Sequence, residues 1–365
     1  MAKKYIPSFL CLFVFLANFV PHLADDAALP TIFILGDSTA DVGTNSFIPD
    51  SKARADFPHN GIDFPNARPT GRFSNGFNSA DFLAKLLGFN RSPPPYLFLV
   101  NQTTGHHKLL HRGVNFASGG SGLLDTTGSK LNVVSLSAQI NQLASLSNNL
   151  SNVISQASTE ATVTNAFFFI SVGSNDIFEY FKTNSTIPKE QFIDNLMSAY
   201  TNHIEALYNL GARKFGIISV APLGCCPAQR LVQKLLTGKD GCFGAMNDIA
   251  LAFHSALDTL LYNISYQLPE IKYSLGNAFK MTIDVINNPH SKFQNVDTAC
   301  CGTGTFNAQG PCNATAELCP DRKKYLFWDL FHPTQKATHL AAETLFFGPP
   351  IYVSPINFYQ LVNNN

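Results

Sequence analysis

A serine, an asparagine and an Asp-x-x-His pair stand beside short apolar segments of this sequence. Ser38 follows FILGD, Asn175 lies in GSND, and Asp329 precedes His332 in WDLFHPT. A fourth segment, SGGSG at 118–122, is mostly glycine. A serine hydroxyl is a poor nucleophile until a base removes its proton, and neutral imidazole titrates near neutral pH. These residue types therefore indicate acyl transfer through a serine.

The histidine and the aspartate have complementary chemical roles in such a reaction. His332 is the candidate general base for Ser38. Asp329 would accept the other ring N–H, which fixes the tautomer and stabilises the imidazolium that forms. A base of this kind contributes about 10²–10⁴-fold to the rate.

The tetrahedral intermediate also needs hydrogen-bond donors for its oxyanion. We expect the backbone N–H groups of Ser38 and Gly119 to supply two of them, and the side-chain amide of Asn175 a third. Glycine suits this position because the substrate must approach the backbone closely. The run of glycines leaves Gly120 as the alternative to Gly119.

Each segment by itself also has an ordinary structural explanation. Ser38 would serve as a helix cap, and Asn175 would satisfy backbone groups. An Asp-x-x-His pair is often no more than surface. Together, however, the segments supply every part that acyl transfer requires. No Gly-x-Ser-x-Gly segment occurs in the chain, which excludes the serine hydrolases that carry their nucleophile there.

Apolar runs and helical patterns alternate along the chain and would position these residues. Near-continuous apolar runs are typical of strands buried on both faces, and we expect strands at 31–35, 113–118, 166–172, 214–220 and 279–285. Apolar residues spaced by three and four predict helices at 82–87, 136–150, 192–207, 249–264 and 334–346.

Strands that alternate with helices predict a parallel sheet covered by helices on both faces. We therefore expect an α/β protein, a three-layer α/β/α sandwich that forms one domain over residues 25–365. Ligands bind outside the carboxyl ends of the strands in such sheets. Three of the polar segments described above follow predicted strands, and WDLFHPT comes just before the last predicted helix, so they should meet at one edge. Long ordered insertions are expected at 46–70 and 287–324.

The first residues of the chain have the pattern of a secretory signal peptide. Lys3 and Lys4 precede an apolar stretch over about 6–20, and small residues follow around Ala24. We expect cleavage after Ala24, which removes residues 1–24. No later stretch is apolar for long enough to cross a bilayer. The mature protein is expected to be secreted into the extracellular space, the apoplast or cell wall, without stable membrane insertion.

Asn-x-Ser/Thr sequons agree with export, although chance would place some in an Asn-rich chain. The candidate glycosylation sites are Asn90, Asn101, Asn149, Asn184, Asn263 and Asn313.

Eight cysteines occur, of which Cys11 lies in the leader. In an oxidising compartment the other seven predict disulfides with at least one thiol left over. A zinc site is the alternative, but adjacent Cys-Cys pairs are poor metal ligands.

The charge balance argues against a polyanionic partner. Lys plus Arg and Asp plus Glu are equal at 25 each, so no basic surface is expected for nucleic acid. His106, His107 and His111 would bind a metal only if an acidic or cysteine ligand were nearby, and none is close in sequence. We expect no metal and no cofactor.

Four ordered segments resemble the sequence blocks of the plant GDSL esterase/lipase family, in the SGNH hydrolase superfamily. The blocks carry an invariant Ser, Gly, Asn and His, and they match FILGDSTADVG, NFASGGSG, VGSND and DLFHPT. FPNARPTGRFSNGFNSADFLAKLLG and ACCGTG match further family stretches. The similarity covers about residues 31–349. The chain departs from the family at Thr39, because the Gly-Asp-Ser-Leu motif after which the family is named has Leu at this position. We expect this difference to affect packing beside Ser38 rather than the chemistry.

The resemblance implies a flavodoxin-like α/β/α fold. It gives the roles argued above to Ser38, Gly119, Asn175, Asp329 and His332. It also implies small-molecule or lipid ester substrates, such as plant lipids or acylated cell-wall and secondary metabolites. Transfer of the acyl group to an alcohol is a close alternative. A non-catalytic secreted glycoprotein on a hydrolase scaffold is the alternative from another class.

Overall fold

The computed structural model describes residues 29–101, 112–288 and 292–363. The signal peptide predicted at 1–24 lies outside these residues, as do His106, His107 and His111. Within the described ranges, no helix combines the length and the apolar character that crossing a membrane requires.

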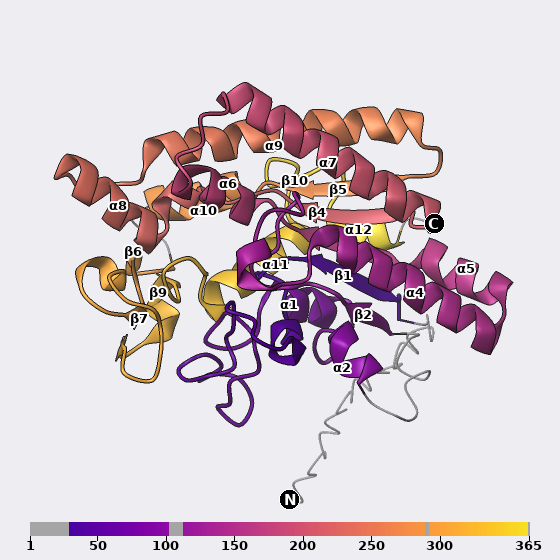
Figure 1. Ribbon diagram of the computed structural model, residues 1–365, viewed down its shortest axis with the longest axis horizontal. Coiled ribbons are helices and arrows are strands. Elements are labelled where there is room, and N and C mark those ends of the chain that lie inside the picture. The colour runs from indigo at the N-terminus through magenta and orange to yellow at the C-terminus, as the bar shows by residue number, and fades with distance from the viewer. Residues whose placement is uncertain (1–28, 102–111, 289–291, 364–365) are drawn as a thin grey trace, which may run out of the picture.

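A six-stranded sheet runs through the middle of the molecule in the order β10-β5-β4-β3-β1-β2 (Figure 1). All neighbouring strands pair in parallel except β10, which pairs antiparallel with β5 at one edge. The strands of this sheet are β1 (Ile32–Gly36), β2 (Gly113–Asn115), β3 (Phe167–Ser171), β4 (Lys214–Ile218), β5 (Lys272–Gly276) and β10 (Val353–Ser354). The predicted α/β class is therefore confirmed.

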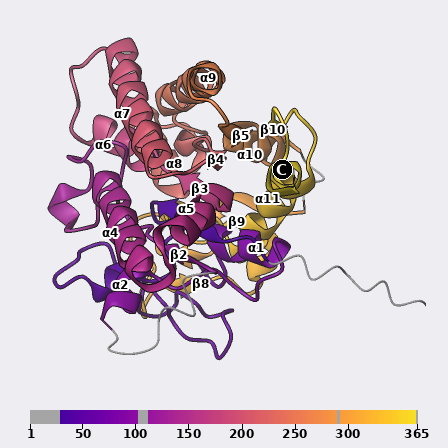
Figure 2. The same ribbon diagram turned by 90° about the vertical axis from the view of Figure 1, so that its right-hand side faces the viewer.

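Helices cover both faces of the sheet (Figure 2). The helices are α1 (Ser79–Leu86), α2 (Tyr96–Val100), α4 (Leu136–Ile154), α5 (Gln156–Asn165), α6 (Ser174–Lys182), α7 (Lys189–Asn209), α8 (Pro227–Thr237), α9 (Gly244–Gln267), α10 (Ala278–Asn287), α11 (Gln335–Phe347) and α12 (Phe358–Asn363). All the helices predicted from apolar periodicity are present. Short 3₁₀ turns lie at Thr44–Phe47, Ser129–Leu131, Leu223–Cys225, Thr305–Asn307 and Arg322–Lys324.

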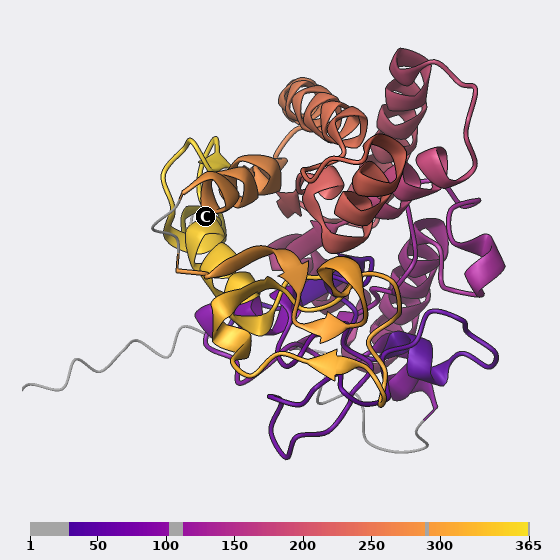
Figure 3. The same cartoon turned by 90° about the vertical axis from the view of Figure 1, so that its left-hand side faces the viewer.

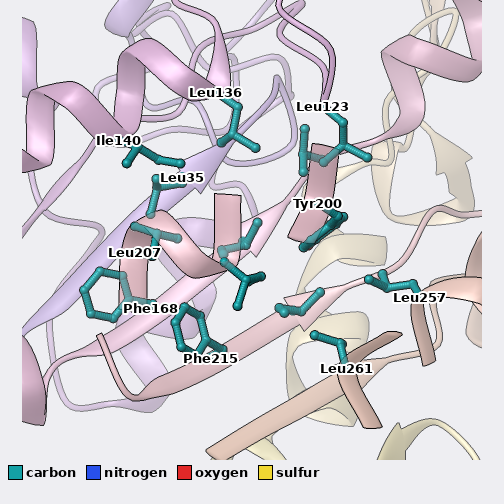
Figure 4. Close-up of a cluster of buried hydrophobic side chains, with 14 of the residues drawn as sticks. Leu35, Leu123, Leu136, Ile140, Phe168, Tyr200, Leu207, Phe215, Leu257 and Leu261 are labelled. Atoms are coloured by element: carbon teal, nitrogen blue, oxygen red, sulfur yellow. The ribbon is translucent and has the colours of Figure 1, made fainter. Parts of the chain in front are cut away.

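The three layers follow from the alternation of side chains along each strand. Phe33 and Leu35 of β1 pack in the core formed with α4, α7 and α9 (Figure 4). Ile32 and Ile34 face the other way, into the core formed with α1, α11 and α12. Both faces of β1 are fully buried, which explains why the strand is almost continuously apolar.

The strand predicted at 279–285 is wrong, because this segment is helix α10. Its apolar and polar residues alternate, but two local features favour a helix. The Asn277 side chain caps the first turn by accepting from the Lys280 N–H at 2.8 Å. Lys280 and Asp284 form an i,i+4 ion pair. The strand of this part of the chain is instead β5, which ends just before the cap.

The two predicted insertions lie against each other (Figure 3). Arg322 donates to Asp63 at 2.8 Å, and the Trp328 indole donates to Asn60 at 3.0 Å. The later insertion contains the small strands β6 (Asn295–Ala299), β7 (Cys301–Gly302) and β8 (Glu317–Leu318), and β9 (Tyr325–Phe327) follows it directly.

The cysteines predicted to form disulfides do so, with one thiol left over. The pairs are Cys225–Cys242, Cys300–Cys319 and Cys301–Cys312. Among the described residues, Cys226 is the remaining thiol, and it is buried. The adjacent cysteines 300 and 301 therefore bind two different partners within the later insertion.

Candidate active site

Ser38 lies in the tight turn that follows β1. The Ala40 and Asp41 N–H groups both donate to the Asp37 carbonyl, at 3.1 and 3.0 Å. The Asp37 carboxylate accepts from the Thr39 N–H and hydroxyl. Thr39 also contacts the Ser171 hydroxyl at 2.8 Å, so it takes part in holding this turn. No helix begins here, which excludes the capping interpretation of Ser38.

The Ser38 hydroxyl contacts His332 across 294 residues of sequence. Its Oγ lies 2.8 Å from His332 Nε2. On the other side of the ring, Nδ1 lies 2.9 Å from both carboxylate oxygens of Asp329. The structure therefore brings together the serine, histidine and aspartate that the sequence analysis singled out, in an order that would pass a proton from Ser38 to His332.

Local hydrogen bonds fix the turn that carries the histidine. Asp329 Oδ1 accepts the backbone N–H groups of Phe331 and His332, at 2.9 and 2.8 Å. The Trp328 N–H donates back to the His332 carbonyl at 2.7 Å. The Phe73 ring lies against the imidazole with the ring centres 5.2 Å apart. The imidazole is thus held by both its neighbours in sequence and a distant ring.

Electrostatics adjust His332 for proton transfer. Its side chain is 12% exposed, and burial tends to lower the pKa of an imidazole. The adjacent Asp329 carboxylate, supported by Asp37, outweighs burial, so the pKa of His332 is raised. Burial would raise the pKa of Asp329, but the imidazole and the backbone donors lower it below its usual value. The aspartate is therefore held as a carboxylate beside the histidine.

The backbone N–H of Gly119, which the sequence predicts as an oxyanion donor, has another partner. It donates to the buried Asp41 carboxylate at 2.9 Å and is not free for an oxyanion. A side chain at 119 would meet the Phe73 ring at 2.4 Å, so glycine is required here for packing rather than for substrate approach. The alternative, Gly120, lines the cavity beside Ser38 and has a φ of +92°, which favours glycine.

Two backbone N–H groups next to the serine have no acceptor. Among the described residues, neither the Ser38 nor the Gly120 N–H donates to a protein group. Asn175, in the first turn of α6 after β3, lines the same cavity. One N–H of its amide donates to the Ser121 carbonyl at 2.8 Å, which fixes the amide and leaves the second N–H.

Sequence reasoning missed the buried polar residues that hold these segments. Gln139 of α4 both accepts from the Gly36 N–H and donates to the Gly36 carbonyl, each at 2.9 Å. Asp176 accepts from Leu123 and Leu124 N–H groups. Polar side chains on otherwise apolar helix faces were the only available signal, because their partners are distant in sequence.

A cavity of about 910 Å³ opens over the serine. Ser38, Gly120, Asn175 and His332 are among the residues that line it, and we call this set the polar end. The remaining wall is mainly apolar and includes Phe178 on α6, Leu236 on α8, Met281 on α10 and Leu345 on α11. The arrangement has room for an apolar group several carbons long next to a nucleophilic hydroxyl.

The described residues contain no cluster of three or more His, Cys, Asp or Glu side chains suited to a metal ion. The candidate glycosylation sites lie mostly at the surface. Asn90, Asn101, Asn149, Asn184 and Asn263 are exposed, and Asn313 is half-buried.

Comparisons with known proteins identify a family for the chain. The sequence profile described as GDSL-like Lipase/Acylhydrolase matches residues 32–345. A GDSL esterase/lipase of Arabidopsis thaliana is 35% identical over 346 residues, which cover 92% of this chain and 91% of that protein. Another from the same plant is 38% identical over 343 residues, covering 92% and 89%.

Solved structures give more distant matches. An acetylxylan esterase from Geobacillus stearothermophilus, crystallised as a catalytic mutant, is 12% identical with a TM-score of 0.37. The match covers 86% of this chain and 92% of the esterase.

Proposed function

This chain belongs to the GDSL-like lipase/acylhydrolase family, and we propose that it hydrolyses carboxylic esters through an acyl-enzyme formed on Ser38. The single observation that supports this mechanism best is the 2.8 Å contact between Ser38 Oγ and His332 Nε2, with Asp329 on the far side of the ring. It is the geometry that a general base needs in order to activate a hydroxyl.

In the first step, His332 takes the proton as Ser38 Oγ attacks the ester carbonyl. Asp329 stabilises the imidazolium through Nδ1. The N–H groups of Ser38 and Gly120 and the amide of Asn175 would donate to the oxyanion. Losing one such donor costs about 2.7–4 kcal/mol. His332 then gives its proton to the departing alkoxide, so the alcohol leaves and the acyl-serine remains.

In the second step, water replaces the alcohol. His332 takes a proton from water, hydroxide adds to the acyl carbonyl, and the tetrahedral intermediate collapses to a carboxylic acid. The proton returns to Ser38 Oγ. Every proton that moves passes through His332 Nε2, so the mechanism needs no metal and no cofactor.

The apolar wall of the cavity supports lipid esters or acylated plant metabolites as substrates. Burying one methylene is worth about 0.8 kcal/mol. An acyl chain along Phe178 and Leu345 would therefore add appreciable binding energy. Acetylated polysaccharide, whose acyl group has a single methyl, would leave most of the 910 Å³ unfilled.

A fluorophosphonate probe tests the mechanism. We expect it to label the wild type and not Ser38→Ala, with loss of p-nitrophenyl ester hydrolysis in the same variant. Ser174→Ala is the matched control, because Ser174 lines the same cavity but has no contact with His332. Labelling that persists in Ser38→Ala, or a folded wild type that is never labelled, would contradict the proposal.

We also propose that the mature protein is a single secreted domain of residues 25–365. The disulfides and the exposed sequons support export. N-terminal sequencing of the protein secreted by a plant host should start at Asp25. A secreted product that retains residues 1–24 would contradict this assignment.

A further inference from the structure

The Gly119–Gly120 peptide is held by side chains from the segment that follows Ser38. Asn45 Nδ2 donates to the Gly119 carbonyl at 2.8 Å, and the Gly119 N–H donates to Asp41 at 2.9 Å. Both side chains are almost inaccessible, with Asn45 2% and Asp41 0% exposed. These contacts are therefore made away from solvent, where hydrogen-bond direction matters most.

The contact to the Gly119 carbonyl determines where the next N–H points. The Gly119 C=O and the Gly120 N–H belong to one planar trans peptide, so they point in opposite directions. With the oxygen directed at Asn45, the N–H is directed away from Asn45. Gly120 lines the cavity, and among the described residues its N–H has no acceptor.

We propose that Asn45 is a positioning residue that orients the Gly120 N–H toward the oxyanion. This inference rests on the proposed ester hydrolysis and adds a residue to it. Asn45 itself does not touch the substrate, since it is not among the residues that line the cavity.

Such a residue is needed because this peptide could otherwise rotate. Gly120 has a φ of +92°, and glycine occupies several backbone conformations at similar cost. A rotated Gly119–Gly120 peptide would present its carbonyl oxygen to the oxyanion and so replace a donor with an acceptor. In that state the Asn45 amide would lose its bond to Gly119, which makes the rotated state unfavourable.

The Asn45 amide is itself fixed by three hydrogen-bond partners. Nδ2 donates to the Ala53 carbonyl at 2.7 Å as well as to Gly119. Oδ1 accepts from the Ser118 hydroxyl, which in turn accepts from the Val134 N–H at 3.0 Å. Two carbonyls on one side and a hydroxyl on the other set which end of the amide is the donor.

The test compares Asn45→Ala with Asn45→Asp. Removing the amide should lower kcat roughly 10- to 100-fold, less than the 10²–10³ that follows deletion of an oxyanion donor, and leave KM within about threefold. Asn45→Asp should be worse than Asn45→Ala, although it preserves shape, because its carboxylate repels the Gly119 oxygen and favours the rotated peptide.

A merely structural role predicts instead that the fall in kcat follows the loss of thermal stability in the two variants, because a buried carboxylate also destabilises the fold. Binding of an alkyl trifluoromethyl ketone also distinguishes a positioning role from a merely structural one, because its adduct places an oxyanion in the site. Its inhibition constant should rise in proportion to the fall in kcat/KM. Asn75→Ala is the control: Asn75 is 3% exposed and accepts from the Gln335 N–H, but does not line the cavity. The kcat of Asn75→Ala and its inhibition constant for the ketone should stay within about threefold of the wild-type values.

Two results would overturn the inference. One is a kcat within about threefold of wild type in both Asn45 variants. The other is a fall in kcat with unchanged inhibition. Failure of the proposed function itself is distinguishable, because it would appear as activity retained in Ser38→Ala. Thermal unfolding of each variant, followed by assays below the lowest midpoint, ensures that only folded protein is compared.

Discussion

The polar end and the apolar wall of the cavity are built on different physical principles. At the polar end, His332 lies within 3 Å of hydrogen-bonding partners on both ring nitrogens, and its neighbours are held by buried anchors. The apolar wall includes side chains from α6, α8, α10 and α11. Hydrogen bonds depend on direction, whereas apolar contact depends on area. The polar end should therefore tolerate almost no change, and the wall should tolerate many.

The polar end and the apolar wall also differ in the parts of the chain that carry them. The polar end rests on segments that follow strands and are fixed by side chains distant in sequence, such as Gln139 on Gly36. The wall includes helix α8, which exposes Leu235 and Leu236 to solvent, at 74% and 69%. We infer that the rate of the reaction is set at the polar end and that preference among esters is set at the wall.

The largest expected effect is at the polar end. Asp329→Asn should lower kcat by about 10⁴ because the amide favours the wrong imidazole tautomer, while KM changes little. Steady-state hydrolysis of a p-nitrophenyl ester measures it. Asp258→Asn, on the exposed face of α9, is the control and should be silent. A loss under tenfold in Asp329→Asn would mean that Asp329 does not orient His332.

A smaller effect is expected at the wall. Ala341→Trp on α11 should shorten the space for an acyl chain. Losing two or three buried methylenes at about 0.8 kcal/mol each lowers kcat/KM for long-chain esters roughly 10- to 50-fold. Short-chain esters should change less than about threefold. Leu251→Trp, at an exposed position of α9, is the control. An equal loss for acetyl and long-chain esters would contradict the division between rate and preference.

The smallest effect comes from pH. The raised pKa of His332 means that the base is protonated, and inactive, up to a higher pH than an ordinary imidazole, above about 6.5. The value of kcat/KM should therefore fall roughly tenfold per pH unit below that pKa. Short and long esters should share one apparent pKa, since Phe178, Ala341 and Leu345 do not ionise. Different pKa values for the two esters would link the wall to the rate.

Most of the fold was predicted correctly from the sequence, and Ser38, Asp329 and His332, which were singled out there, lie within hydrogen-bonding distance of one another in series. Apolar runs marked β1 to β4, and three- and four-residue spacing marked the long helices, because these patterns follow from local geometry. The strand predicted at 279–285 was wrong because its apolar and polar residues recur with the period of a strand, whereas the segment is helix α10. Only the Asn277 cap and the Lys280–Asp284 pair distinguish the two.

By itself, the sequence determined which residue types are available and in what order: a serine after a buried strand, an amide after another and an Asp-x-x-His pair before the last helix. Tertiary structure alone decided that Ser38 meets His332, that Gly119 packs on Phe73, and that Gly120 faces the cavity. The reason is that hydrogen-bond direction depends on the path of the backbone. A shift of one residue exchanges a bonded N–H for a free one, and the glycines of SGGSG carry no side chain that would reveal which is which.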